Sequence, residues 1–417
     1  MTSAPDRSIA QPSDPPLGAN RDFKVMLAGQ GASSIGDAVT FTVLPILVLA
    51  LTGSGLAMGV VGVLQTVPHL VVGLLAGAFA DRSDRRRMML AADLGRAVLT
   101  AFIPLSAALG IPTMAVILVI AAPESVLGTI FLAAYTAATP ALVGRSRIGT
   151  ATAVFEAVYS FGYILGPIIA GVLVGVVGPT TTLGIDAASF LISALALSLV
   201  RRPLIAPPDR PATHILADVR EGISYVATHS MLRPLLGFWT SVSVVNAPLV
   251  PVLTFLITRD RGLPATSFGA ILAAFGVGTV LGSLLTVRLV RGRAGWVMLS
   301  GNLARGALLI GAAFAPTVLL ILPLAFAAGL ADSLVLVTYI AVRAAAAPDE
   351  LIGRIGSTMR TISVGLQPIG MVIGGAVLDI GHGTATLAGM GILLMVISLL
   401  FAPSRALRDV HLRRIAH

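Results

Sequence analysis

The stretch Gly77–Met89 reads GAFADRSDRRRMM and concentrates charge in a chain that has little of it. Charged residues make up only 11% of the 417 residues and hydrophobic residues 56%, yet this short segment holds two Asp and four Arg. Soluble domains usually carry about 25% charged residues. The sequence therefore predicts a membrane protein, in which each spanning helix needs roughly 20 apolar residues.

Outward from this stretch, turn residues and charges divide the chain into twelve apolar runs. The runs predict an all-α membrane protein with twelve transmembrane helices in two pseudo-symmetric six-helix bundles. The first six runs cover 23–51, 56–80, 88–110, 112–143, 148–178 and 180–200. The last six cover 235–258, 264–290, 294–315, 317–346, 351–380 and 382–402. The predicted parts are a disordered cytoplasmic tail (1–22), an N-terminal bundle (23–200), a cytoplasmic linker (201–234), a C-terminal bundle (235–402) and a cytoplasmic tail (403–417).

The distribution of Arg among the loops predicts the orientation. One set of loops, on the side of both termini, holds Arg82, Arg85, Arg86, Arg87, Arg145, Arg147, Arg201, Arg202, Arg288, Arg291, Arg293 and Arg354. Positive loops remain in the cytoplasm. We therefore expect a multi-pass protein of the bacterial inner membrane with both termini cytoplasmic. The formal charge of +9 then orients helices and does not indicate a nucleic-acid partner.

An internal repeat supports the division into halves. Arg147–Thr150 reads RIGT and Arg354–Ser357 reads RIGS, which places them half a chain apart (354 − 147 = 207). Gly166–Gly171 (GPIIAG) is similar to Gly370–Gly375 (GMVIGG). Transporters commonly contain such repeats, with the substrate site between them near the middle of the bilayer.

The charged stretch resembles the signature loop between helices two and three of the major facilitator superfamily. That signature is a Gly, three residues, Asp, Arg and then further basic residues, and the matching positions are Gly77, Asp81, Arg82, Arg85 and Arg86. Asp84 stands where the general pattern has a Gly. The form DR-x-DRRR resembles the branch that contains macrolide-efflux and siderophore-export proteins.

A second motif supports the same family. LGPIIAG, in the fifth run, resembles the superfamily's antiporter motif, and its matching residues are Gly162, Gly166, Pro167 and Gly171. Small residues at this spacing let another helix approach closely, and the Pro bends the helix. The resemblance covers about residues 23–402. It implies that helices one, four, seven and ten line a central cavity.

Acidic residues inside the apolar runs are the candidates for proton coupling. Asp37, Glu124 and Asp332 lie near the middle of the first, fourth and tenth runs. Ionisable groups in a membrane are costly and indicate function by default. Burial favours the neutral form of a carboxyl, so a proton and a substrate could compete for these groups.

The charged loop predicts a cytoplasmic gate. Asp81 and Arg82 form a candidate latch between the halves, and the gate as a whole includes Gly77, Asp81, Arg82, Arg85, Arg86, Asp93, Arg96 and Glu156. Asp93 and Arg96 are interpreted as an ion pair beside the loop. Many drug antiporters carry an Arg in helix four. This chain has none there, and Arg96 in the third run is the Arg that lies inside a membrane run of this half.

Residues that could line the cavity and contact a substrate are Tyr163, Trp239, Asn246, Tyr339 and Gln367. Aromatic residues make up only 5% of the chain, so we expect a largely aliphatic cavity.

The sequence offers no pattern for an enzyme or for a cofactor. It has no Cys, no His cluster with metal-ligand spacing and no phosphate-binding loop that ends in Gly-Lys-Ser/Thr.

The resemblance implies proton-coupled efflux of small, largely apolar molecules such as antibiotics, driven by the proton gradient and carried out by a monomer in contact with membrane lipid. Export of an endogenous siderophore or secondary metabolite, uptake of a nutrient, and a non-transporting assembly factor remain alternatives.

Overall fold

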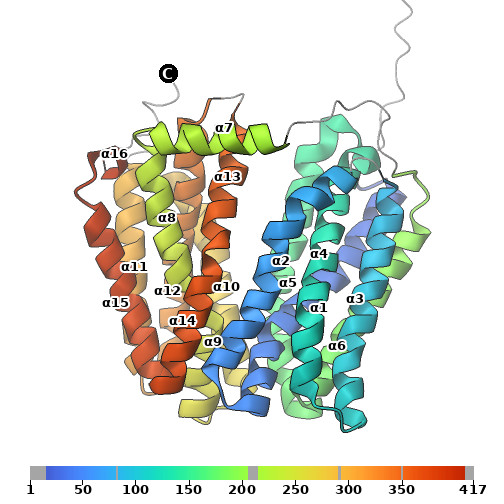
Figure 1. Cartoon of the computed structure of the whole chain (residues 1–417), viewed down its shortest axis with the longest axis horizontal. Coiled ribbons are helices and arrows are strands. Elements are labelled where there is room, and N and C mark those ends of the chain that lie inside the picture. Colours follow the sequence, from blue (N-terminus) through green and yellow to red (C-terminus); the bar gives the residue numbers. More distant parts are fainter. Residues whose placement is uncertain (1–15, 81–82, 205–214, 290–292, 349–350, 409–417) are drawn as a thin grey trace, which may run out of the picture.

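Twelve membrane-length helices form the protein. The computed structural model describes residues 16–80, 83–204, 215–289, 293–348 and 351–408. Within these residues, twelve helical spans are long and apolar enough to cross a membrane, which confirms the expected all-α architecture. Figure 1 shows them as two groups of upright helices side by side.

The N-terminal half is made of six uninterrupted helices, which occupy the blue to green part of Figure 1. They are α1 (Arg21–Thr52), α2 (Gly55–Ala80), α3 (Arg85–Ala108), α4 (Thr113–Val143), α5 (Ile148–Val177) and α6 (Pro179–Leu199), with a short turn of helix, η1 (Arg145–Arg147), before α5.

The C-terminal half follows an additional helix, α7 (Ile215–Thr228), which lies across one end of the molecule (Figure 1). This helix falls inside the segment expected to be a linker. The membrane helices of this half are α8 (Leu232–Asn246), α9 (Leu249–Thr254), η2 (Phe255–Asp260), α10 (Ala265–Leu289), α11 (Ala294–Phe314), α12 (Val318–Ala346), α13 (Ile352–Gly365), α14 (Gln367–Ile380) and α15 (Gly383–Phe401), followed by the short α16 (Arg405–Arg408).

Two spans of the C-terminal half are interrupted. The span that contains α8, α9 and η2 breaks after Asn246, where Pro248 removes a backbone donor. The span that contains α13 and α14 breaks at Leu366, just before Pro368. Broken helices expose polar groups at membrane depth and often carry the binding sites of transporters. The first break therefore places Asn246 at a position suited to ligand binding.

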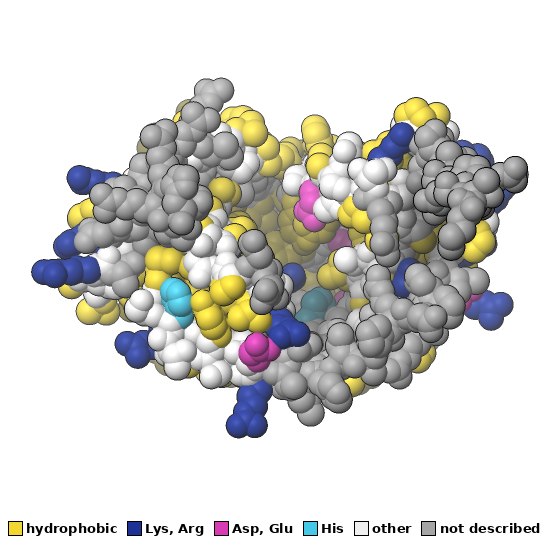
Figure 2. Space-filling model, turned by 90° about the horizontal axis from the view of Figure 1, so that it is seen from above, with side chains coloured by type: hydrophobic (Ala, Val, Ile, Leu, Met, Phe, Trp, Pro, Cys, Tyr) yellow, Lys and Arg dark blue, Asp and Glu magenta, His cyan; other side chains and the backbone are white. Residues whose placement is uncertain are grey.

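The two halves meet along two seams at the end opposite α7. In one seam α5 crosses α10: a Cβ added at Gly269 would lie 2.1 Å from the Pro167 carbonyl oxygen. In the other seam α2 crosses α14: a Cβ added at Gly59 would lie 2.4 Å from the Met371 carbonyl oxygen. Only glycine allows such close approach of two backbones. Towards α7 the halves diverge, and Figure 2 shows the hollow between them from that face, with hydrophobic side chains on its floor.

Hydrogen bonds between the halves also close the end opposite α7. Asp379 of α14 accepts hydrogen bonds from Ser54 Oγ (2.7 Å), from the Gly55 backbone N–H (2.5 Å) and from the Leu56 backbone N–H (3.1 Å). Its carboxylate thus caps the N-terminus of α2, where free N–H groups and the helix dipole favour an anion. Arg259 donates to the Gly53 carbonyl oxygen beside it. We call these contacts the far-end latch.

Replacing Asp379 with Ala is expected to loosen the far-end latch. The change removes three hydrogen bonds to a charged acceptor, so the separated arrangement of the halves should become at least about tenfold more populated. The readout is the rate at which a membrane-impermeant maleimide labels Met58→Cys, because Met58 is buried on α2 near the latch and the chain contains no native Cys. His382→Ala, a neighbour in the same surface depression, is the matched control. Equal labelling rates in the two variants would contradict the latch.

Candidate functional site

A buried Arg joins two acidic residues in the middle of the N-terminal half. Arg96 of α3 donates from Nη2 to Asp37 Oδ1 of α1 (2.5 Å) and from Nε to Glu124 Oε1 of α4 (2.9 Å). Its guanidinium also lies 3.9 Å from the centre of the Phe190 ring of α6. Only 8% of Arg96 is exposed, so its charge is compensated mainly by these two carboxylates. We call this group the Arg96 cluster.

This arrangement corrects the expected role of Arg96. Arg96 does not pair with Asp93 at the charged loop; its side chain extends to two carboxylates on other helices, which together provide more favourable contacts than one neighbour on the same helix. Asp93 itself is completely buried. Thus Arg96 belongs to the centre of the bundle.

The C-terminal half contains a second buried Arg with the same kind of partners. Arg305 of α11 forms a salt bridge from Nη1 to Asp332 Oδ1 of α12 (2.7 Å) and donates a hydrogen bond from Nη2 to Asn246 Oδ1 at the end of α8. Arg305 is only 1% exposed and, among the residues that the structure describes, is the largest fully buried side chain. We call this group the Arg305 cluster.

The two clusters are related by the internal repeat. Met89–Arg96 reads MLAADLGR and Met298–Arg305 reads MLSGNLAR, with the two Arg residues separated by 305 − 96 = 209 positions. Asp37 and Asn246 have the same separation (246 − 37 = 209). The sequence predictions omitted Arg305, although this local repeat would have indicated it as the equivalent of Arg96.

The antiporter motif packs against the part of α1 that carries Asp37. A Cβ added at Gly162 would lie 2.8 Å from Ser34 Oγ, and one added at Gly166 would lie 2.4 Å from Ala38 Cβ. Gly171 lies further along α5, where an added Cβ would be 2.8 Å from the Ala265 carbonyl oxygen of the other half. The motif therefore brings α5 into close contact with both the Asp37 segment and the opposite half, around Pro167, which lacks a backbone N–H for the helix.

In the charged loop, the described Arg residues stabilise helix ends inside the N-terminal half. Arg85 Nε donates to the Ala80 carbonyl oxygen at the end of α2 (3.2 Å). Arg86 Nε donates to the Leu197 carbonyl oxygen near the end of α6 (3.0 Å), as cations commonly do at helix C-termini. Asp84 accepts from the Arg86 backbone N–H (3.0 Å) and so caps α3. A polar cap explains why Asp84 replaces the Gly of the general pattern.

For the other predicted gate residues, the structure shows no contact among its described residues that would support a role in a gate. Asp81 and Arg82 lie outside the described residues. A Cβ added at Gly77 would meet no atom within 4 Å, and Glu156 is exposed on α5.

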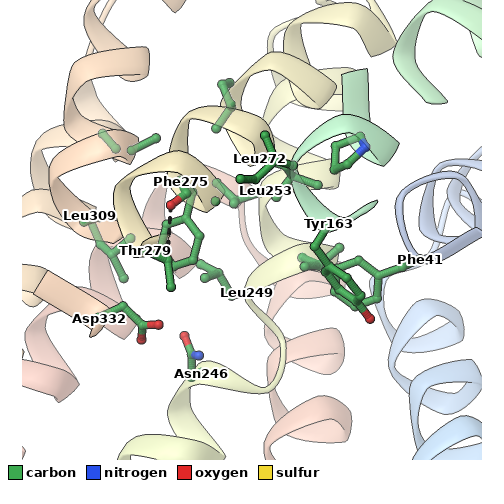
Figure 3. A pocket seen from close by; sticks show the side chains of 18 of the residues that line it. Phe41, Tyr163, Asn246, Leu249, Leu253, Leu272, Phe275, Thr279, Leu309 and Asp332 are labelled. Atoms are coloured by element: carbon green, nitrogen blue, oxygen red, sulfur yellow. Dashed lines mark hydrogen bonds between the residues drawn. The ribbon is translucent and has the colours of Figure 1, made fainter. Parts of the chain in front are cut away.

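A cavity of about 410 Å³ lies between the halves, and its wall includes residues of the Arg305 cluster but none of the Arg96 cluster. Its wall is mostly apolar and comes from α1, α5, α8, α9, α10, α11 and α12 (Figure 3). Asn246 and Asp332 of the Arg305 cluster lie on its wall. Phe41, one helical turn after Asp37, lies against Tyr163 (ring centres 6.0 Å apart) at the other side of the cavity.

Three residues predicted for the cavity lie elsewhere. Trp239 stacks on Tyr339 inside the C-terminal half, with ring centres 4.3 Å apart, and Tyr339 is 2% exposed. Gln367 begins α14 and does not line this cavity. Tyr163 and Asn246 do line it. Among the residues that the structure describes, no group of His, Asp and Glu side chains is arranged to hold a metal ion.

Two six-helix halves, a buried Arg in each and a cavity between them define a membrane transporter of the major facilitator type. Residues 15–413 match the family described as transmembrane secretion effector, and the chain belongs to this family. It is 30% identical to the multidrug efflux pump Tap of Mycolicibacterium fortuitum over 393 aligned residues, and this aligned region covers 91% of this chain and 94% of that protein.

More distant relatives support the same assignment. The enterobactin exporter EntS of Escherichia coli O1:K1 / APEC is 26% identical over 285 residues, or 67% of each chain. Among solved structures, the nucleoside transporter NupG matches with a TM-score of 0.74 at 16% identity, over 92% of this chain and 99% of that one. A bacterial homologue of the human lysosomal transporter Spinster matches with a TM-score of 0.72 at 14% identity, over 94% and 97%. At these identities the structural matches concern the fold alone.

Proposed function

We propose that the protein exports small, largely apolar molecules across the bacterial inner membrane in exchange for protons. The observation that supports this most strongly is the Arg96 cluster, a pair of membrane-embedded carboxylates on one Arg, in a protein that has an apolar cavity between its halves. The abundance of Arg near α7 supports a cytoplasmic location for that face and for both termini. The chain carries both clusters and the cavity itself, which supports a monomer as the working unit.

In the proposed cycle, a proton on the Arg96 cluster and a substrate in the cavity favour opposite orientations. Two carboxylates and one Arg leave an excess negative charge, which is costly in a low-dielectric interior until a proton neutralises it. Protonation of Asp37 would remove its ionic contact with Arg96 and free α1 to shift against α5. The glycine contacts between α1 and α5 would transmit that shift towards the seam with α10.

The substrate class follows from the cavity wall. Leu249, Leu253, Leu272 and Phe275 supply apolar surface, and the volume suits a drug-sized molecule. The names of the two relatives, a multidrug pump and an enterobactin exporter, support either foreign or endogenous cargo. Export of an endogenous siderophore or secondary metabolite is therefore the second candidate, which a biosynthetic cluster beside the gene would favour.

Transport by inside-out vesicles tests the proposal. With an imposed pH gradient, acidic inside, we expect wild-type vesicles to accumulate the neutral dye Nile red or the cationic dye ethidium, and a protonophore should abolish the accumulation. Ser160→Phe places a bulky ring in the cavity wall and should lower accumulation about tenfold or more, because it removes space that the substrate occupies.

The matched control is Ile168→Phe on the same helix, whose side chain is exposed and does not line the cavity. It should transport like wild type. Wild-type vesicles that accumulate neither dye, nor any member of a wider antibiotic panel, under a pH gradient would contradict proton-coupled export.

A further inference from the structure

The internal repeat keeps the two Arg residues but changes the acids around them. At the position equivalent to Asp37 the C-terminal half has Asn246, and at the position equivalent to Asp93 it has Asn302 (302 − 93 = 209). Asn302 is completely buried and donates from Nδ2 to the Leu394 carbonyl oxygen and to Ser398 Oγ, both at 2.8 Å. Asn has the shape of a protonated Asp but cannot ionise. The two halves thus place side chains of the same shape at these equivalent positions, but the Asp residues can bind and release a proton and the Asn residues cannot.

The two clusters differ in charge as a result. Asp37 and Glu124 contact Arg96, and the buried carboxyl groups of Asp93 and Asp186 lie near enough to Asp37 to interact with it electrostatically. Asp186 accepts a hydrogen bond from Thr40 Oγ1 (2.5 Å) on α1. The remaining titratable or charged groups near this cluster are His69, which is hydrogen-bonded to Ser125 beside Glu124, and Tyr159, Tyr163 and Arg360. With two carboxylates on one Arg and two further buried acids nearby, the N-terminal half has an excess of acids that a proton can neutralise.

The Arg305 cluster is balanced by comparison. Arg305 pairs with one carboxylate, Asp332, and its second contact is the neutral amide of Asn246. One positive and one negative charge at contact distance leave no excess that a proton would neutralise. Protonating Asp332 would instead leave Arg305, 1% exposed, without a counter-charge.

The balanced cluster also presents free hydrogen-bonding groups to the cavity. Arg305 uses Asp332 Oδ1 and Asn246 Oδ1, and contact with the guanidinium fixes the orientation of the amide. Within the described part of the chain, Asp332 Oδ2 and Asn246 Nδ2 have no other hydrogen bond. Figure 3 shows both side chains directed towards one another at the edge of the apolar wall. They offer one acceptor and one donor to a bound molecule.

We propose that the two halves divide the work: the Arg96 cluster carries the exchanged proton, and the Arg305 cluster holds no exchangeable proton but binds the substrate. This inference rests on the proposed function and specifies it. The substrate class is an apolar molecule, without a required charge, that bears a hydrogen-bond donor for Asp332 Oδ2 next to an acceptor for Asn246 Nδ2, as an amide or a lactam does. Asp332 is thereby assigned to substrate binding and not to proton coupling.

The test measures protons released when the neutral fluorescent lactam dye 2-quinolone, which carries an N–H donor next to a carbonyl acceptor, binds to the purified protein, with a pH indicator in weakly buffered detergent solution, together with the affinity of the dye. Asp37→Asn, which gives the N-terminal half the chemistry of the C-terminal half, should lower proton release about tenfold or more. Asn246→Asp, the reverse exchange, should increase it about twofold by creating a second cluster with excess negative charge. The double variant Asp332→Asn with Arg305→Gln removes both charges together and should retain proton release while weakening binding about tenfold.

Two results would overturn the division of work: a double variant that releases no protons although it binds dye, or an Asp37→Asn variant that releases as many as wild type. Size-exclusion profiles show whether each variant is folded. If the double variant does not fold, Asn246→Ala provides the same test, with weaker binding and retained proton release. Wild-type protein that binds dye without any proton release would instead overturn the proposed function itself, and the inference with it.

Discussion

Replacing Asp37 with Asn is expected to abolish transport driven by a pH gradient, with accumulation in inside-out vesicles lowered at least about 100-fold, the usual effect of removing a proton-transferring group. The amide keeps the shape of the side chain and can still accept a hydrogen bond from Arg96, but it cannot bind and release a proton. Asn246 occupies the equivalent position beside Arg305, so this fold already accommodates an amide next to a buried Arg. We therefore expect the variant to fold and to reach the membrane.

The matched control is Asp22→Asn, which makes the same chemical change on the same helix at its first turn. Asp22 accepts hydrogen bonds from the backbone of Arg201 and Arg202, away from the cavity, and an Asn oxygen can replace that acceptor. This control should transport within about twofold of wild type, since the half-buried side chain keeps an acceptor for the two backbone N–H groups and lies away from the cavity. If Asp37→Asn transports as well as Asp22→Asn, Asp37 does not carry the proton.

Replacing Gly166 with Leu is expected to have the second large effect. Even a Cβ at this position would lie 2.4 Å from Ala38 Cβ and 3.2 Å from the Ala38 carbonyl carbon, so α5 and α1 must separate. Overpacking of this kind usually costs about 1–3 kcal/mol, and here it also displaces the segment that holds Asp37 against Arg96. We expect a lower melting temperature in detergent and transport reduced about tenfold or more.

Gly175→Leu provides a stringent control for the packing effect. Gly175 is on the same helix, is exposed, and an added Cβ would meet no atom within 4 Å. It should melt and transport like wild type, whereas Gly166→Ala should fall between wild type and Gly166→Leu. A Gly166→Leu variant as stable and active as Gly175→Leu would show that the close contact between α1 and α5 has no role in transport.

Much of the fold could be predicted because a segment that crosses the bilayer must meet physical requirements that are visible in its sequence. A helix must satisfy its own backbone hydrogen bonds and present apolar side chains to the bilayer, so each span is visible as an apolar run. The same requirements make a membrane-embedded acid conspicuous, which is how Asp37, Glu124 and Asp332 were identified. The arginines were harder to interpret, since Arg is also common in loops and at helix ends.

Contacts between helices were the part that single runs could not predict. Asp93 and Arg96 are three residues apart and were expected to pair, yet Arg96 reaches carboxylates that are 59 and 28 positions away in the sequence. Trp239 and Tyr339 have the chemistry of cavity residues, but they stack on each other inside the C-terminal half. A short repeat around Arg305 carried the missing information, and it becomes interpretable once Arg96 is known to be central.

The amino-acid sequence by itself determined the number of spans, their division into two halves and the rarity of charge within them, because these properties depend on each residue's own transfer between water and lipid. The tertiary structure alone decided which charges meet, which half has acids in excess and which apolar faces enclose a cavity. Those properties depend on distances between helices, and the free energy of a buried charge is set by the partners that the packed helices bring within a few ångströms of it.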